Sequence, residues 1–218
     1  MIPKVKICCI STIEEAKLAI ASGASALGLV AKMPSGPGVT SDEKIREIAS
    51  VIPPPIASFL LTSETSALQI IQHQKRVGTN TIQIVDELKT GSYDEIRFAL
   101  PEIKIVQVIH ITGKESIEQA ISIASHVDAL LLDSGNPNLQ VKELGGTGRK
   151  HDWRISRKIR DAISIPIFLA GGLNPENVQE AIRVVEPFGV DVCTGVRTNG
   201  NLDPFKVERF MNSVRDLK

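Results

Sequence analysis

The hydrophobic positions along this chain fall into short, almost uninterrupted apolar runs, separated by longer segments in which apolar residues recur at helical spacing. Uninterrupted runs predict strands that are covered on both faces, and the segments between them predict the helices that cover them. The pattern repeats eight times. Strands are expected at residues 4–10, 25–30, 56–61, 81–85, 103–109, 128–133, 165–170 and 190–194.

Strands that alternate with helices pair in parallel, and eight such units favour a closed barrel over an open doubly wound sheet. Open sheets usually carry a glycine-rich dinucleotide turn, G-x-G-x-x-G, after their first strand, and residues 4–10 are not followed by one. The 218 residues suffice for one such barrel and are short for two cores. The sequence therefore predicts an α/β fold, with a single (β/α)8 TIM barrel domain over residues 1–218.

Polar residues mark the expected helix starts. Ser11 with Glu14, and Thr40 with Glu43, have the spacing of capping boxes, in which two side chains satisfy free backbone N–H groups. Gly23 is typical of a helix end. Later helices are expected to begin near Thr65, Ser92, Ser116, Asp152, Pro175 and Pro204, the two prolines occupying the first helical position.

The composition argues against several classes of partner. The 25 basic and 25 acidic side chains cancel, so no net field attracts nucleic acid or an anionic membrane. The apolar runs are far shorter than the ~20 residues of a membrane-spanning helix, and the N-terminal residues do not read as a secretory signal. No Cys/His cluster has zinc spacing, so no metal site is expected.

Cysteine usage favours a reducing compartment. The chain has three cysteines, an odd number, and the neighbours Cys8 and Cys9 are poorly placed to bridge each other. Disulfides are rare in the cytosol. We therefore expect a cytoplasmic protein.

Cys8 is the first candidate for chemistry, since functional residues of such barrels lie where the strands end. Side chains alternate along a strand, so Cys8 shares a face with Lys6 while Cys9 points the other way. A thiol there acts as a base or nucleophile if its pKa falls below about 8.5. The alternative is a small buried hydrophobic residue.

Asp133 is the second candidate, because it directly follows the apolar run 129–132. Burial there would raise the pKa of its carboxyl group, which is what a general acid requires near neutral pH. The alternative is a residue that caps the turn at Ser134 and Gly135.

Three glycine-rich turns follow the last predicted strands. Gly171-Gly172 and Thr194-Gly195 occupy the two loops that commonly bind phosphate in such barrels, where bare backbone N–H groups approach the anion. Turn geometry alone is the alternative. Residues 145–148, after the sixth strand, either close over a ligand or form a flexible connector. They lack the spacing of a nucleotide P-loop.

These blocks together resemble the phosphoribosylanthranilate isomerase family, in family order across nearly the whole chain. The resemblance rests on residues 6–8, 15–16, 23–28, 131–134, 145–148, 152–153, 169–178, 189–192 and 195–196. It implies a (β/α)8 barrel and an Amadori rearrangement that needs no cofactor. In it, a phosphoribosyl amine becomes a 1-deoxyribulose phosphate.

The resemblance also implies roles for particular residues. Asp133 matches the general acid that protonates the furanose ring oxygen, and Cys8 matches the base that removes the C2 proton. Asp191 matches a carboxylate at the site. The residues that match substrate and phosphate-binding positions are Gly146, Gly171, Gly172, Thr194 and Gly195.

Departures from the family pattern cluster at the other end of the substrate. Residues 35–38 read Ser-Gly-Pro-Gly where the family has Ser-Pro-Arg, so the arginine that faces the anthranilate carboxylate is missing. Lys32 is a candidate to replace it, without the planar fork of arginine. Residues 83–86 read Gln-Ile-Val-Asp in place of Gln-Leu-His-Gly, and Cys9 replaces a glycine. Arg197 replaces a glutamate, and is a candidate for binding the phosphate or a substrate carboxylate.

Three functions follow from these observations. The first is a phosphoribosylanthranilate isomerase of tryptophan biosynthesis. The second is a paralogue that isomerises a sugar phosphate with a different aglycone, motivated by the missing arginine. The third is a non-catalytic sugar-phosphate binding protein. In each case the expected partner is a small phosphorylated sugar, and the chain is a monomer or a homodimer.

Overall fold

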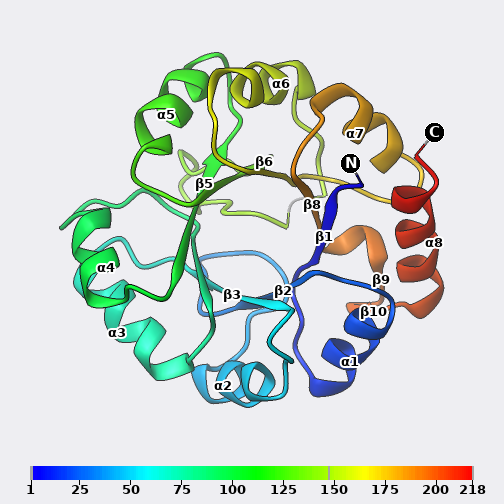
Figure 1. Cartoon of the computed structure of the whole chain (residues 1–218), viewed down its shortest axis with the longest axis horizontal. Helices are drawn as coiled ribbons and strands as arrows, with labels where there is room; N and C mark the ends of the chain where they lie inside the picture. The colour runs from blue at the N-terminus through cyan, green and yellow to red at the C-terminus, as the bar shows by residue number, and fades with distance from the viewer. Residues whose placement is uncertain (1, 147, 218) are drawn as a thin grey trace.

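Eight parallel strands close into a barrel in the part of the chain that the structure describes, residues 2–146 and 148–217 (Figure 1). Each strand pairs with the next, and the last pairs with the first, in this computed structural model. The strands are β1 (Lys4–Ile7), β2 (Ala26–Val30), β3 (Ala57–Thr62), β4 (Thr81–Ile84), β5 (Lys104–His110), β6 (Ala129–Asp133), β7 (Ile167–Leu169) and β8 (Gly189–Val192). The predicted barrel is confirmed.

Helices surround the barrel as an outer ring (Figure 1). They are α1 (Ile13–Ala21), α2 (Asp42–Ser50), α3 (Ala67–Val77), α4 (Tyr93–Ala99), α5 (Glu115–Ala124), α6 (Trp153–Ala162), α7 (Val178–Val185) and α8 (Pro204–Arg215). Between β8 and α8 lie elements that the pattern did not predict: a short 3-10 helix, η1 (Thr194–Val196), and a hairpin of β9 (Arg197–Thr198) and β10 (Asn201–Leu202).

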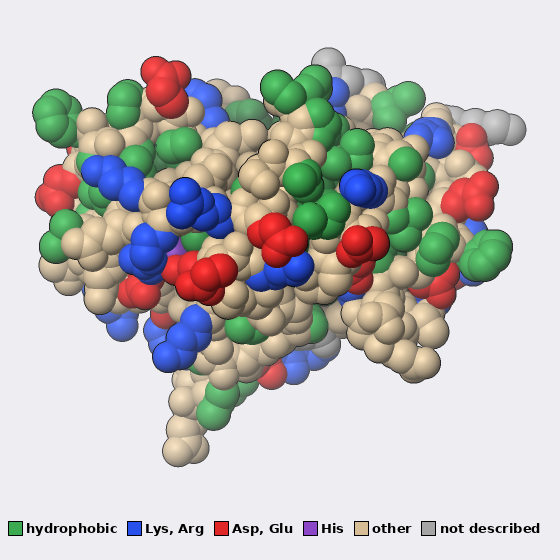
Figure 2. Space-filling model, turned by 90° about the horizontal axis from the view of Figure 1, so that it is seen from below, with side chains coloured by type: hydrophobic (Ala, Val, Ile, Leu, Met, Phe, Trp, Pro, Cys, Tyr) green, Lys and Arg blue, Asp and Glu red, His purple; other side chains and the backbone are tan. Residues whose placement is uncertain are grey.

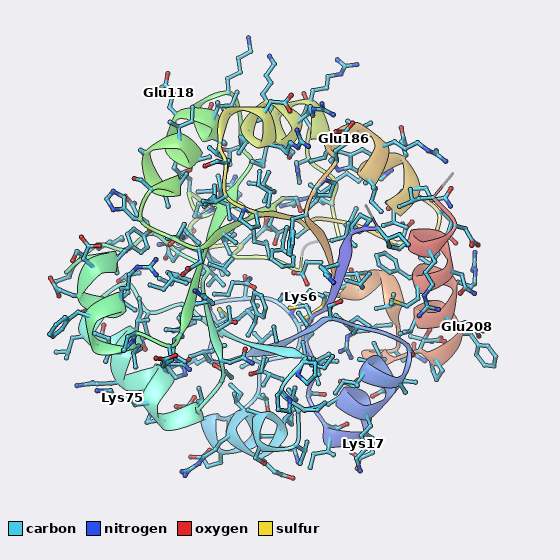
Figure 3. All side chains as sticks on the ribbon, viewed as in Figure 1. Lys6, Lys17, Lys75, Glu118, Glu186 and Glu208 are labelled. Carbon is cyan, nitrogen blue, oxygen red and sulfur yellow. A yellow bond between two sulfur atoms is a disulfide. The ribbon has the colours of Figure 1, made fainter. Side chains whose placement is uncertain are left out.

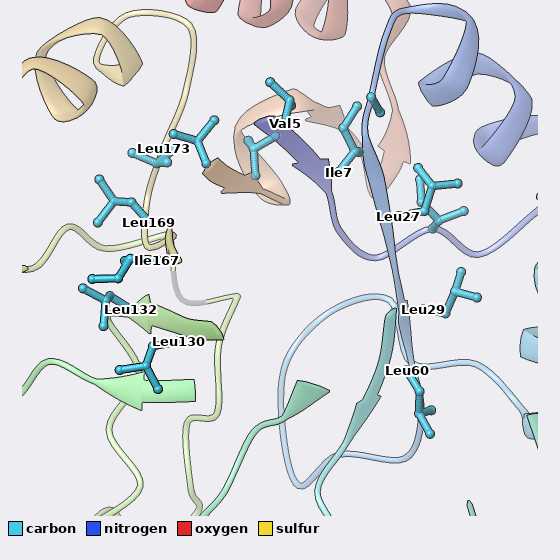
Figure 4. Close-up of a cluster of buried hydrophobic side chains, with 14 of the residues drawn as sticks. Val5, Ile7, Leu27, Leu29, Leu60, Leu130, Leu132, Ile167, Leu169 and Leu173 are labelled. Carbon is cyan, nitrogen blue, oxygen red and sulfur yellow. The ribbon is translucent and has the colours of Figure 1, made fainter. Parts of the chain in front are cut away.

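The hydrophobic core has two shells. Outward-facing strand residues such as Ile7, Leu29 and Leu132 pack against the helices (Figure 4), and each is fully buried. A second cluster fills the barrel interior, with Phe59, Leu131 and others. Burying a side chain of this size contributes roughly 1.5–3 kcal/mol, so the two shells hold the strand ends in a fixed arrangement.

Strand β1 ends at Ile7, earlier than predicted, because Cys9 has a φ of 64°. That value lies in the left-handed region, which an extended strand cannot contain. The Cys8 N–H still donates to the Val192 carbonyl at 2.8 Å. Cys8 therefore lies directly beyond the strand while the pairing of β1 with β8 continues.

Two predicted caps are wrong by one residue. Thr12 and Ser41, rather than Ser11 and Thr40, begin α1 and α2, and each hydroxyl accepts from a backbone N–H three residues on. The sequence offers overlapping cap residues at both places, and the face that must be buried selects between them. The helix starts predicted near Ser92, Asp152 and Pro204 are confirmed, and the capping residues there are Ser92, Asp152 and Asp203.

Other predicted helix starts are shifted. Helix α7 begins at Val178 rather than Pro175, because the Asn174 side chain accepts from two following N–H groups and holds residues 175–177 in a turn. Helix α3 begins after Ser66, one residue later than expected, and α5 begins at Glu115. Ser116 instead donates its hydroxyl to the His110 carbonyl at 3.2 Å.

The surface mixes charges of both signs. On the face seen in Figure 2, Lys and Arg side chains alternate with Asp and Glu. None of the helices in the described residues has the length and apolar character needed to cross a membrane.

Candidate active site

A cavity opens at the carboxyl ends of the barrel strands, and it collects most of the predicted site residues. It is lined by Cys8, Cys9, Val30, Met33, Ser35, Gly36, Pro37, Leu61, Gln83, Val85, Asp133, Leu144, Gly145, Gly146, Gly148, Ala170, Gly171, Gly172, Leu173, Asp191, Cys193 and Thr194. The predicted base and acid thus share one cavity with the glycine turns, although β1 and β6 are far apart in sequence.

Cys8 lies on the wall of this cavity as a free, buried thiol. Burial raises the pKa of the Cys8 thiol to about 11, although the nearby Lys6 ammonium acts to lower it. The resting group is therefore a protonated thiol at neutral pH, and any role as a base requires further stabilisation of the thiolate.

Lys6 forms a buried ion pair beneath Cys8. Its side chain projects from β1 into the middle of the barrel (Figure 3), where Nζ donates to Asp191 Oδ1 at 2.9 Å. Burial acts to lower the pKa of Lys6, but the charges of Asp191 and Cys8 and the hydrogen bonds to them together raise it. Burial in turn raises the pKa of Asp191, which Lys6 opposes. We assign the pair as ammonium and carboxylate, because the short hydrogen bond satisfies both buried groups.

Gly28 on β2 leaves space for the Cys8 thiol and the Lys6 ammonium to lie side by side. A Cβ atom at Gly28 would lie 2.7 Å from Cys8 Sγ and 3.0 Å from Lys6 Nζ. Both distances are closer than ordinary van der Waals contact allows. The thiol and the ammonium can therefore lie side by side only because β2 has no side chain here.

Replacing Lys6 with methionine should destabilise the fold strongly. The change leaves Asp191 buried without a counter-charge, which typically costs about 3–5 kcal/mol. Urea unfolding measures the loss. Lys4→Met, at the exposed start of the same strand, is the matched control and should change stability by less than about 0.5 kcal/mol. Equal stability of the two variants would contradict the assignment.

Asp133 caps the turn that follows β6, which was one of its two predicted roles, and it also lines the cavity. Its Oδ1 accepts from the Ser134 N–H at 2.7 Å, so the carboxyl group does cap the following turn. Its Oδ2 faces Gly145, where a Cβ atom would approach to 2.9 Å. One oxygen thus fixes the orientation of the group while the carboxyl also lines the cavity.

The glycine turns after β6, β7 and β8 converge on one side of the cavity. A Cβ atom at Gly172 would lie 2.8 Å from the Gly148 carbonyl oxygen, and one at Gly195 would lie 2.0 Å from the Leu173 carbonyl oxygen. Gly171 and Gly172 also have positive φ values of 85° and 63°. Side chains are therefore excluded, and the backbone is exposed as an anion site requires. Thr147, in the same segment, lies outside the described residues.

Lys32 and Arg197, the two predicted specificity residues, do not line the cavity. Lys32 is exposed and does not line the cavity. The Arg197 guanidinium is buried, with Nη1 donating to Glu15 Oε1 at 2.7 Å and Nη2 donating to the Cys9 carbonyl at 2.6 Å. It also stays outside the lining. The geometry supports a structural role for Arg197, holding the β1–α1 connection, in place of substrate binding.

Gln83 is a cavity residue that the sequence analysis did not select. It lies on β4, is 3% exposed and lines the cavity, yet its Oε1 is buried without a hydrogen-bond partner in the described part of the chain. Buried polar groups are nearly always paired. A glutamine within an apolar strand was the available signal.

Cys9 and Cys193 form a disulfide across the ends of β1 and β8, with Cα atoms 6.0 Å apart. The sequence analysis did not foresee this pair, because only barrel closure brings the two residues together. Gly38 packs against it, since a Cβ atom there would lie 2.4 Å from Cys9 Cβ. Cys8 is left as the free thiol among the described residues.

Comparisons with known proteins agree with this geometry. The family model described as N-(5'phosphoribosyl)anthranilate (PRA) isomerase matches residues 5–213. The N-(5'-phosphoribosyl)anthranilate isomerase 2 of Methanosarcina mazei is 36% identical over 215 residues, covering 98% of this chain and 94% of that protein.

Solved structures give the same result. A phosphoribosylanthranilate isomerase in complex with reduced 1-(o-carboxyphenylamino)-1-deoxyribulose 5-phosphate has a TM-score of 0.77 and 27% identity, over 98% of both chains. Monomers of the dimeric enzyme from Thermotoga maritima have a TM-score of 0.78 and 26% identity, also over 98% of both chains. With the barrel, the shared cavity and the full-length match in place, this chain belongs to the N-(5'-phosphoribosyl)anthranilate isomerase family.

Proposed function

We propose that this chain isomerises N-(5'-phosphoribosyl)anthranilate by an Amadori rearrangement in tryptophan biosynthesis, with Cys8 as base and Asp133 as acid. The observation that carries the proposal is their position: a thiol from β1 and a carboxyl from β6 line one cavity beside the converging glycine turns. The substrate is a small phosphorylated sugar. The protein is a monomer or homodimer, which size-exclusion chromatography tests. We keep the cytoplasmic location for a biosynthetic enzyme of this family, although the Cys9–Cys193 disulfide removes the cysteine argument for it; cell fractionation tests the location.

The reaction needs two proton transfers. Asp133 donates a proton to the furanose ring oxygen, the C1–O bond breaks, and the nitrogen lone pair forms a protonated Schiff base. Cys8 first releases its thiol proton to solvent, and the thiolate then removes the C2 proton. The electrons of the C2–H bond neutralise the nitrogen to give an enolamine, which tautomerises to the ketone. Each such transfer typically contributes about 10²–10⁴-fold to the rate.

The thiol becomes a competent base only when its charge is compensated. Lys6 already acts to lower the pKa of Cys8. A protonated Schiff base beside the thiol adds a second positive charge and favours the thiolate further. The high pKa of the resting thiol therefore fits a base that is activated during turnover.

One observation favours a second candidate, the same rearrangement with a different aglycone. Apolar side chains of Val30, Met33, Leu61 and Val85 line the β2–β4 side of the cavity and suit an aromatic ring. The described lining contains no lysine or arginine, however. A substrate carboxylate would meet no cation there.

A paired assay separates the two candidates. Freshly generated phosphoribosylanthranilate and the corresponding phosphoribosylaniline, which lacks the carboxylate, are compared by kcat/KM. A preference for the anthranilate of about 100-fold or more corresponds to a charge-assisted contact of about 3 kcal/mol and supports the first candidate. Equal values support the second, and tight binding without turnover of either supports a non-catalytic binder.

Gln83→Leu should raise KM about 2- to 12-fold with a small change in kcat, the value of one neutral hydrogen bond. The carboxamide oxygen, which has no hydrogen-bond partner among the described residues, is placed to accept from a polar group of the substrate. Steady-state kinetics test this. Thr81→Val, on the same face of β4 but away from the cavity, is the control. An unchanged KM in Gln83→Leu would show that the amide does not contact the substrate.

A further inference from the structure

Two loops meet above the cavity and form its cover. The Ser35 hydroxyl, from the β2–α2 connection, donates to the Lys142 carbonyl, from the β6–α6 connection, at 2.7 Å. Close by, a Cβ atom at Gly146 would lie 2.4 Å from Pro37 Cδ. The β6–α6 connection therefore packs directly against the β2–α2 connection.

A salt bridge fastens this connection to the barrel wall. Lys142 Nζ donates to Asp86 Oδ2, which lies at the end of β4. Asp86 is 7% exposed, whereas the Lys142 side chain is 32% exposed. Asp86 stands where the family pattern has a glycine. The salt bridge is therefore possible only because residues 83–86 depart from that pattern.

Asp86 is a rigid anchor. Its Oδ1 accepts from the Glu87 N–H at 2.9 Å, and its carbonyl accepts from Gln107 Nε2 at 3.0 Å. A carboxylate already fixed by the barrel loses little conformational entropy when it pairs. Most of the entropy cost of the salt bridge therefore comes from ordering the Lys142 side chain and its loop.

The fastened segment contributes directly to the cavity. Leu144, Gly145 and Gly146 follow Lys142 in the chain and line the cavity. Gly145 passes beside Asp133 Oδ2, where even a Cβ atom would approach to 2.9 Å. The position of the Lys142 backbone therefore determines how closely the cover encloses the Asp133 carboxyl.

We propose that Asp86 and Lys142 are positioning residues that hold the β6–α6 connection closed over the cavity, so that Gly145 shields the Asp133 carboxyl from water. The catalytic part of this inference rests on the proposed function. Without the salt bridge the closed arrangement is less populated. The apparent affinity for substrate then decreases in proportion to the fraction of molecules that remain closed. Substrate binding restores closure, so kcat changes less than KM.

A double-mutant cycle tests the pairing. Asp86→Asn and Lys142→Met should each raise KM about tenfold and change kcat less than threefold, since closure acts on affinity. The double variant should be no worse than either single one, because both remove the same interaction. Lys44→Met, which removes an exposed pair with Glu47, is the control and should match the wild type. Additive losses in the double variant would overturn the proposal.

Limited trypsin digestion gives a readout that does not depend on catalysis. Cleavage after Arg149, in the same connection, should be about tenfold faster in both single variants than in the wild type, because the rate follows the open population. Far-UV circular dichroism verifies that each variant is folded, and Lys142→Met, at a half-exposed position, remains informative if Asp86→Asn does not fold. Unchanged cleavage in folded variants would overturn the inference. Faster cleavage in a chain that lacks isomerase activity would uphold the closure and reject the proposed function.

Discussion

We expect Asp133→Asn to lower kcat about 10²- to 10⁴-fold, the usual contribution of a positioned general acid. Asparagine has the same shape, and its Oδ1 can still accept from the Ser134 N–H, which holds the side chain in the native structure. The turn should therefore survive while the transferable proton is lost. The loss of anthranilate fluorescence from freshly generated substrate measures the rate.

A matched change separates chemistry from turn geometry. Ser134→Ala keeps the backbone N–H that Asp133 accepts from and removes the hydroxyl that contacts the same oxygen at 3.4 Å. It should retain kcat within a few-fold. An Asp133→Asn enzyme with kcat close to that of the wild type would reject the carboxyl as the acid, whatever its position in the cavity.

Cys8→Ser and Cys8→Ala should each lower kcat about 10²- to 10⁴-fold. The serine variant keeps the size of the side chain but replaces the thiol with a hydroxyl, which is far less acidic. If Cys8 were only a buried hydrophobic residue, both variants would remain active, and serine would be the less stable because its hydroxyl is desolvated. Kinetics and urea unfolding on the same two proteins therefore distinguish the functional from the structural reading.

The titration of Cys8 adds a consequence for its reactivity with alkylating reagents. Only the thiolate reacts, and a pKa of about 11 means that its fraction rises about tenfold for each pH unit between pH 8 and 10. An ordinary thiol levels off near pH 9 instead. Peptide mapping after iodoacetamide treatment reports this site separately from Cys9 and Cys193, and a plateau below pH 9 would show that Lys6 outweighs burial.

The amino-acid sequence determined the barrel and most of the site. Continuous apolar runs such as residues 129–132 can be buried only as strands covered on both faces, and residues that follow such strands in a closed parallel barrel must meet at one rim. For that reason Asp133 and the glycine turns could be assigned to one cavity without coordinates. Strands and helices can be recognised from the sequence because their periodicity depends only on residues that are close together along the chain.

Tertiary structure decided what depends on barrel closure. Lys142 and Asp86 are 56 residues apart, Arg197 and Glu15 are 182 apart, and Cys9 and Cys193 are 184 apart. No periodicity links such positions, because each pair forms only after strand register and loop paths are fixed. The sequence analysis accordingly considered Arg197 as a candidate substrate ligand and did not foresee the disulfide of Cys9 with Cys193. The packing of the loops decides which charged side chains pair with each other and which ones face the cavity.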